Sequence, residues 1–171
     1  MSCGEINIVW LQKIISGGQT GVDRAALDFA IKHNIRHGGW VPKGRKAEDG
    51  PLPRKYHVRE LLTESYRERT ERNVLGADGT ILISRENLTG GSALTRELAK
   101  SHKKPWIHID LRNLSATMAA ARIISWIKKN NIITLNVAGA KASKDPYIYE
   151  AVIDLLDVIY LTDKQIFDVQ E

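Results

Sequence analysis

The chain has little cysteine and no long hydrophobic run, and each scarcity excludes a class of protein. Cys3 is the only cysteine among 171 residues, so no internal disulfide and no cysteine-based metal site can form, and a reducing compartment is the simplest setting. The longest apolar runs, such as residues 81–83, are only a few residues long, whereas a membrane helix needs roughly 20. Residues 1–5 lack the features of a signal peptide. We therefore expect a cytoplasmic protein without a membrane partner.

Catalytic motifs that depend on a fixed spacing are also missing. The five histidines are scattered singly, and none has the spacing of a zinc site. No Gly-x-Ser-x-Gly segment indicates a hydrolase triad. The glycine-rich segments follow neither the Gly-x-Gly-x-x-Gly pattern of dinucleotide-binding proteins nor the Gly-x-x-x-x-Gly-Lys-Ser/Thr pattern of P-loops. The sequence therefore predicts no metal site, no zinc and no NAD.

The charge balance is modestly basic. The net charge is +5, with 43% apolar and 26% charged residues, which is a globular composition. Much of the excess positive charge lies in residues 43–59 and on helix faces mixed with glutamate. A small anionic ligand explains a local basic loop as well as a nucleic acid does. We favour the small ligand and keep nucleic acid as the weaker alternative.

Short apolar segments alternate with helical patterns along the chain. Strands are predicted at residues 13–16, 39–41, 79–84, 106–110 and 133–138. Helices are predicted at residues 22–33, 65–75, 92–101, around 119–127, and at 145–157. The strands are apolar throughout, which is typical of a parallel sheet buried on both faces.

This pattern predicts an α/β fold, a three-layer Rossmann-like doubly wound parallel sheet of about five or more strands. We expect one domain over residues 1–171, with a peripheral or frayed end at 1–10. Our first expectation for the strand order is three-two-one-four-five. Ligands of such sheets bind at the carboxyl ends of the strands, so the loops that follow the strands are the candidate site.

The first candidate loop, residues 16–24, follows a strand and opens a helix. Glycines allow a tight turn and a close approach of the backbone to a ligand, and the N–H groups at a helix start favour an anion. The residues predicted to bind ligand here are Gly17, Gly18, Gln19, Thr20, Gly21, Asp23 and Arg24. Thr20 and Asp23 also have the spacing of a capping box, so an alternative is that they serve only the helix.

Two further loops have the same position after a strand. Residues 87–97 contain a second glycine pair that can cradle an anion, and residues 138–146 form a polar turn that contains lysines. The residues predicted to bind ligand are Thr89, Gly90, Gly91, Ser92, Thr95, Gly139, Ser143 and Lys144. Lys43 and Arg45 belong to a long polar loop, residues 42–59, that is interpreted as a basic lid over the anion or as a merely solvated loop.

These three segments together resemble a known family, the molybdenum cofactor carrier proteins, in the superfamily that includes the Lonely Guy phosphoribohydrolases. The resemblance covers residues 13–156 and is carried by residues 15–24, by 89–92 with 94–95, and by 136–139 with 143–146. It implies that the cargo is the molybdenum cofactor, molybdate or a nucleotide-derived phosphate compound.

The hydrolase branch of that superfamily implies a second function. Its Pro-Gly-Gly-x-Gly-Thr-x-x-Glu motif is similar to residues 89–97, where two glycines and Glu97 match but Ala93 and Leu94 replace a glycine and a threonine. Arg69 falls where those enzymes use an arginine. The resemblance implies that Arg69 would hold a phosphoribosyl group and that Glu97 would assist cleavage of an N-glycosidic bond. We favour binding over hydrolysis, and the hydrolase relatives imply a homo-oligomer.

Overall fold

The computed structural model describes residues 11–167, apart from the side chain of Gln165. Its centre is a five-stranded sheet in which every pair of neighbours is parallel. In spatial order the strands are β2 (Arg36–Gly38), β1 (Lys13–Ile15), β9 (Thr134–Gly139), β7 (Gly79–Ser84) and β8 (Trp106–Asp110). The α/β, Rossmann-like fold predicted from the sequence is confirmed. The expected frayed end at 1–10, including Cys3, lies outside the described residues.

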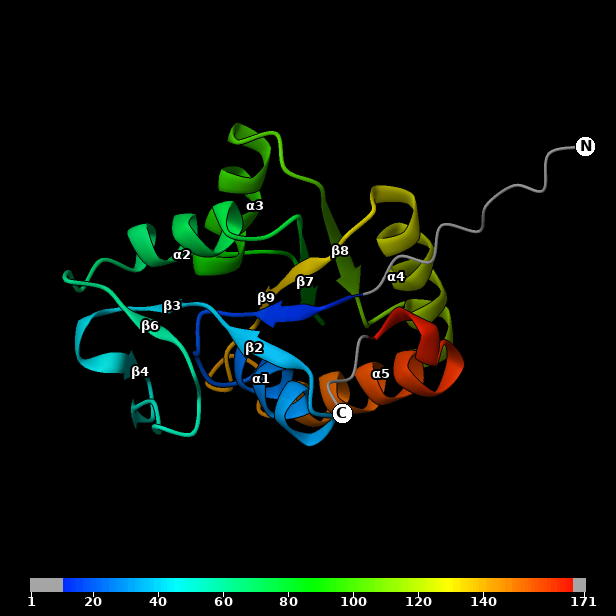
Figure 1. The fold of residues 1–171 in the computed structure, drawn as a ribbon, viewed down its shortest axis with the longest axis horizontal. Coiled ribbons are helices and arrows are strands. Elements are labelled where there is room, and N and C mark those ends of the chain that lie inside the picture. The colour runs from blue at the N-terminus through cyan, green and yellow to red at the C-terminus, as the bar shows by residue number, and fades with distance from the viewer. Residues whose placement is uncertain (1–10, 168–171) are drawn as a thin grey trace, which may run out of the picture.

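The five α-helices of the described residues cover the two faces of the sheet (Figure 1). They are α1 (Val22–Lys32), α2 (Tyr66–Leu75), α3 (Gly90–Ser101), α4 (Ala116–Asn130) and α5 (Ile148–Thr162). Helix α5 packs against α1 and α4 on one face, and α2 packs against α3 on the other. Because apolar strands need cover on both faces, this arrangement buries β7 and the middle of β9.

The predicted strand order is wrong. Strand β9, the last along the chain, lies between β1 and β7 and pairs with both. The sequence of a strand that is buried on both faces does not show which strands lie beside it. The strand order is therefore decided by helix packing. Helix α5, which follows β9, packs against both α1 and α4, and this packing returns the chain to the middle of the sheet.

The strand predicted at residues 39–41 is also corrected. The second strand of the central sheet ends at Gly38, and residues 40–41 form β3 (Trp40–Val41), which pairs with β6 (Arg59–Glu60) in a separate sheet. Gly39 separates the two with φ of 126°, and a Cβ there would lie 2.1 Å from the backbone oxygen of Ser16. Only glycine fits this turn beside β1.

Of the three N-terminal helix caps predicted from the sequence, the structure confirms one and contradicts two. The hydroxyl of Ser65 accepts a hydrogen bond from the backbone N–H of Glu68 at 3.1 Å, as the capping box predicts. Thr20 does not cap α1, whose N-cap is Gly21, because its hydroxyl bonds instead to the loop after β9. Asp145 does not cap α5, because it lies three positions before Ile148 and the N-cap is Tyr147, whose N–H donates to the Asp145 carboxylate at 3.1 Å.

The segment at residues 42–59 is folded rather than merely solvated. It contains three short elements, η1 (Lys43–Arg45), β4 (Lys46–Ala47) and β5 (Gly50–Pro51). Outside this segment, a second 3₁₀ turn, η2 (Lys164–Ile166), follows α5. Leu52 and Tyr56 are buried against Leu27 of α1 and Val41. This small second core holds the segment against the middle of α1. Among the described helices, none is both long enough and apolar enough to span a bilayer.

Candidate functional site

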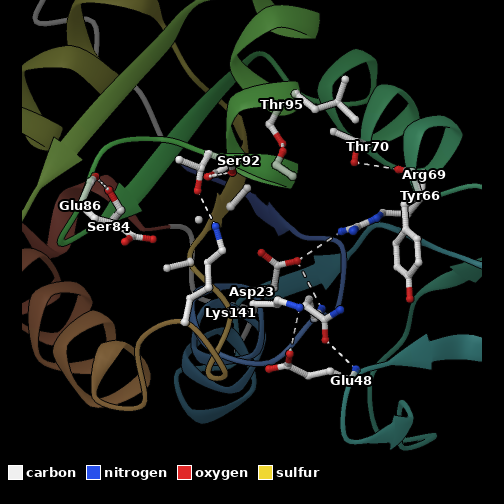
Figure 2. Close-up of a pocket in the computed structure, with 18 of the residues that line it drawn as sticks. Asp23, Glu48, Tyr66, Arg69, Thr70, Ser84, Glu86, Ser92, Thr95 and Lys141 are labelled. Atoms are coloured by element: carbon white, nitrogen blue, oxygen red, sulfur yellow. Dashed lines mark hydrogen bonds and ion pairs between the residues drawn. The ribbon is translucent and has the colours of Figure 1, made fainter.

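A cavity of about 370 Å³ opens at the carboxyl ends of β7 and β9, beside the loop that follows β1 (Figure 2). Its volume is within the range of small-ligand sites. The position is the one expected for a doubly wound sheet, because β1 leads outward to β2 on one side and β7 leads outward to β8 on the other. The residues predicted from the sequence that line it are Gln19, Asp23, Arg69, Thr89, Gly91, Ser92, Thr95, Gly139 and Lys144.

One wall is built around the ion pair of Asp23 and Arg69. The side chain of Asp23 is 6% exposed and that of Arg69 is 15% exposed, with Nη1 of Arg69 3.4 Å from Oδ2 of Asp23. The guanidinium passes over Gly17, where a Cβ would lie 1.6 Å from Nη1. Gly17 therefore serves the site by making room for Arg69.

Burial raises the pKa of Asp23, and the nearby charge of Arg69 opposes this shift. The carboxylate also accepts a hydrogen bond from the backbone N–H of Gln19 at 3.2 Å. On the guanidinium, Nε is buried and has no hydrogen-bond partner among the described residues. This wall of the cavity therefore contains two largely buried groups of opposite charge.

The opposite wall is the start of α3. Its N-cap, Thr89, makes no side-chain capping bond, so the N–H groups of the first turn are left for water or a ligand. Gly90 has φ of 51°, and a Cβ on Gly91 would meet nothing within 4 Å. The ammonium of Lys144 contacts the hydroxyl of Thr89. Helix dipole, N–H groups and a lysine thus meet at one point, which is the arrangement that binds anions.

The loop after β9 forms the third side and is engaged by Glu48, at the tip of the β4–β5 hairpin. The N–H and hydroxyl of Ser143 donate to the two carboxylate oxygens at 3.0 and 2.6 Å. The hydroxyl of Thr20 also contacts the carboxylate, and Nζ of Lys141 lies 3.3 Å from it. Desolvation opposes ionisation, but these hydrogen bonds prevail and lower the pKa of Glu48 to about 2.

Several residues predicted to bind ligand lie outside the cavity lining. Arg24 forms a two-pronged ion pair with Asp49 at 3.0 Å, away from the cavity. Arg45 donates to the carbonyl oxygens of residues 52, 53 and 56, and so holds its own loop together. The others outside the lining are Gly17, Gly18, Thr20, Gly21, Lys43, Gly90 and Ser143. A Cβ on Gly21 would lie 2.4 Å from the backbone oxygen of Ala140.

Glu97, the acid that the hydrolase resemblance implies, also lies outside the lining. Its side chain is 58% exposed and pairs with Arg96 at 3.0 Å and with Lys100 at 3.9 Å. These contacts are those of a solvated helix residue. The structure therefore separates Arg69, in the cavity wall, from Glu97, on the surface of α3.

Other cavity residues were not named individually as ligand-binding residues, although five of them lie in the predicted loops at 87–97 and 138–146. They are Glu48, Tyr66, Thr70, Ser84, Glu86, Asn87, Leu94, Ala138, Ala140 and Lys141. Ser84 and Glu86 lie on one side of the cavity and Tyr66 on the other (Figure 2). The hydroxyl of Ser84 donates to the carbonyl of Glu86 at 2.6 Å and lies 2.8 Å from Nε2 of His108. A polar residue at the end of an apolar strand was the available signal for Ser84.

Comparison with known proteins identifies the family. Residues 14–160 match the model of the circularly permutated YpsA SLOG family. The chain belongs to this family, and the resemblance predicted from its sequence is confirmed. No curated protein matches the chain.

The solved structures that match the chain include the following two. The "Putative molybdenum carrier protein" of Syntrophus aciditrophicus is 57% identical, with a TM-score of 0.86 over 87% of this chain and 94% of that one. An (E)-4-hydroxy-3-methyl-but-2-enyl diphosphate reductase is 11% identical, with a TM-score of 0.37 over 84% of this chain and 58% of that one, and supports no conclusion.

Proposed function

We propose that the cavity binds a small anionic ligand, a phosphate-bearing compound or a tetrahedral oxyanion, and that the chain acts as a carrier or sensor of it. The observation that carries the proposal is the start of α3, where Gly91 and the uncapped first turn line the cavity and Lys144 lies beside them. An anion placed there would accept backbone hydrogen bonds and meet the positive end of the helix dipole.

The name of the Syntrophus aciditrophicus protein supports a molybdenum compound as cargo. Molybdate is a tetrahedral dianion, and the molybdenum cofactor contains a phosphate, so both offer the oxygen atoms that this corner of the cavity would bind. Among the described residues, no group of three histidine, cysteine, aspartate or glutamate side chains could hold a metal ion. We therefore propose recognition through the oxygen atoms or the phosphate of the ligand, with molybdenum as part of the cargo.

Hydrolysis of an N-glycosidic bond is the alternative that the sequence left open. Arg69 supports it because it lines the cavity, whereas the exposed position of Glu97 leaves the reaction without the acid that the resemblance assigned to it. We therefore prefer binding to turnover. The cytoplasmic location, the single domain and the homo-oligomer stay predictions from the sequence.

The proposal is tested by titration calorimetry and thermal shift with molybdate, sulfate, inorganic phosphate, a pterin phosphate and nucleoside monophosphates. A ligand at about 100 times its Kd should stabilise the fold by roughly 2.7 kcal/mol. The variant Lys144→Met should weaken binding at least about tenfold, the equivalent of one 1.4 kcal/mol contact. The matched control Lys100→Met removes a lysine that pairs with Glu97 at 3.9 Å, and should leave binding unchanged.

Two outcomes would contradict the proposal. Equal loss in both lysine variants would show a general charge effect instead of a site at α3. Release of free base from a nucleoside monophosphate, followed by chromatography, would make the chain a hydrolase. Preference for molybdate over sulfate, which has the same charge and shape, would identify molybdate as the ligand.

A further inference from the structure

The carboxylate of Glu48 lies in a ready-made anion site. Its donors are the N–H and hydroxyl of Ser143, the hydroxyl of Thr20 and the ammonium of Lys141, and the distances from Ser143 and Lys141 run from 2.6 to 3.3 Å. Two hydroxyls, an amide and a cation would serve the oxygens of a phosphate or of another carboxylate equally well. Thr20 and Ser143 are also residues that the sequence predicted to bind ligand. In the structure they bind a carboxylate of the same chain.

This anion site is continuous with the cavity. Glu48 and Lys141 both line the cavity, and Figure 2 shows them below Ser92 of α3. Gln19 joins the two regions, because its side-chain oxygen accepts from the N–H of Glu48 at 2.8 Å while its own N–H donates to Asp23 at 3.2 Å. A ligand at the start of α3 that extends along the cavity would therefore reach Glu48.

The base of the hairpin that carries Glu48 is held by contacts that do not involve Glu48. The tip is the two-residue connection Glu48-Asp49 between β4 and β5. The base is held by the buried side chains of Leu52 and Tyr56 and by the three hydrogen bonds of Arg45. Gly50, next to the tip, has φ of 110°, and a Cβ there would meet nothing within 4 Å. Displacing Glu48 thus disturbs polar contacts near the surface and leaves the small core intact.

We propose that the ligand carries two anionic groups, one bound at the start of α3 and one that displaces Glu48 from the site made by Thr20, Lys141 and Ser143. This inference rests on the proposed function and adds the class of ligand to it. Glu48 then acts as an internal competitor: ligands with a single anionic group leave it in place, and ligands with two must replace it. If Glu48 fills the site nine-tenths of the time, its removal strengthens binding of the second group about tenfold.

The test compares adenosine 5′-monophosphate with adenosine 3′,5′-bisphosphate, which differ by one phosphate, and inorganic phosphate with pyrophosphate, a pair with a shorter spacing. Calorimetry is run on the wild type, on Glu48→Gln, which keeps the shape and removes the charge, and on Glu48→Ala. The matched control is Asp49→Asn on the same hairpin tip, whose carboxylate pairs with Arg24 outside the cavity lining. Circular dichroism establishes that each variant is folded.

We expect both Glu48 variants to bind at least one of the two doubly charged probes about tenfold more tightly, with less than a twofold change for its singly charged partner, and Asp49→Asn to change neither. Ser143→Ala should reduce the preference for two anionic groups. Equal changes for both members of each pair, no change, or weaker binding of the doubly charged probes would make Glu48 a structural tether and overturn the inference, while the proposed function would stand. Absence of binding by all probes and by molybdate would overturn the proposed function and the inference with it.

Discussion

The variant Gly17→Ala tests how the cavity wall is built. A Cβ at this position would lie 1.6 Å from Nη1, 2.7 Å from Cζ and 3.0 Å from Cδ of Arg69, and these are its three nearest neighbours. Since unstrained contacts need about 3.5 Å, the guanidinium would have to move by roughly 2 Å. Nη1 is already 3.4 Å from Oδ2 of Asp23, so the ion pair would be lost.

The expected cost follows from burial. Breaking a fully buried ion pair costs about 3–5 kcal/mol, but Asp23 keeps its hydrogen bond from Gln19, and burial already raises its pKa, so it can take up a proton. We therefore expect Gly17→Ala to lower the free energy of unfolding by about 1–3 kcal/mol, the usual range for an added methyl group in a packed site. Arg69→Ala loses the same ion pair and should cost a similar amount.

The double variant distinguishes this explanation from simple crowding. Once Arg69 is alanine, the new methyl group at position 17 meets none of the three atoms that it would have met. The double variant should then be no less stable than Arg69→Ala alone, within about 0.5 kcal/mol. Urea denaturation followed by circular dichroism measures all three variants. If the two single effects add, Arg69 does not occupy the space above Gly17, and this account of the wall is wrong.

Three further predictions concern single residues. Gly91→Ala places a methyl group where nothing lies within 4 Å, so stability should stay equal or rise by up to about 1 kcal/mol while calorimetry shows weaker phosphate binding; lost stability would contradict the open position. Glu97→Gln changes an exposed side chain and should alter neither ligand affinity nor stability by more than about 0.5 kcal/mol. Loss of binding in this variant would show that Glu97 contributes to the site. The pKa of the Glu48 carboxylate is lowered from 4.5 to about 2, so the stabilisation by this carboxylate is present above pH 4.5 and is lost as the pH falls toward 2. The thermal midpoint of the wild type should therefore decline more steeply over this pH range than that of Glu48→Gln. Parallel curves for the two proteins would contradict the stabilising role of the Glu48 carboxylate.

The amino-acid sequence by itself determined four strands of the central sheet, the five helices in outline, and the edge of the sheet that carries the candidate site. Apolar segments at residues 79–84 and 106–110 coincide with β7 and β8. Strand β7 is buried along its whole length, and a strand buried on both faces must be apolar whatever its neighbours are. The glycine-rich loops at 16–24 and 87–97 and the polar loop at 138–146 were predicted to share one edge. They do so because the carboxyl ends of parallel strands meet there.

Only the tertiary structure decided the strand order and the contacts across the site. Nothing in residues 134–139 indicates that this strand lies between β1 and β7, since the order depends on how α5 packs against α1 and α4. Glu48 and Thr20 lie 28 positions apart in the chain, and Glu48 and Ser143 lie 95 apart. Their meeting depends on the small core that seats the hairpin. Local sequence patterns show which residues are apolar and which favour a turn. Contacts between residues so far apart in the chain form only when the helices and the hairpin have packed.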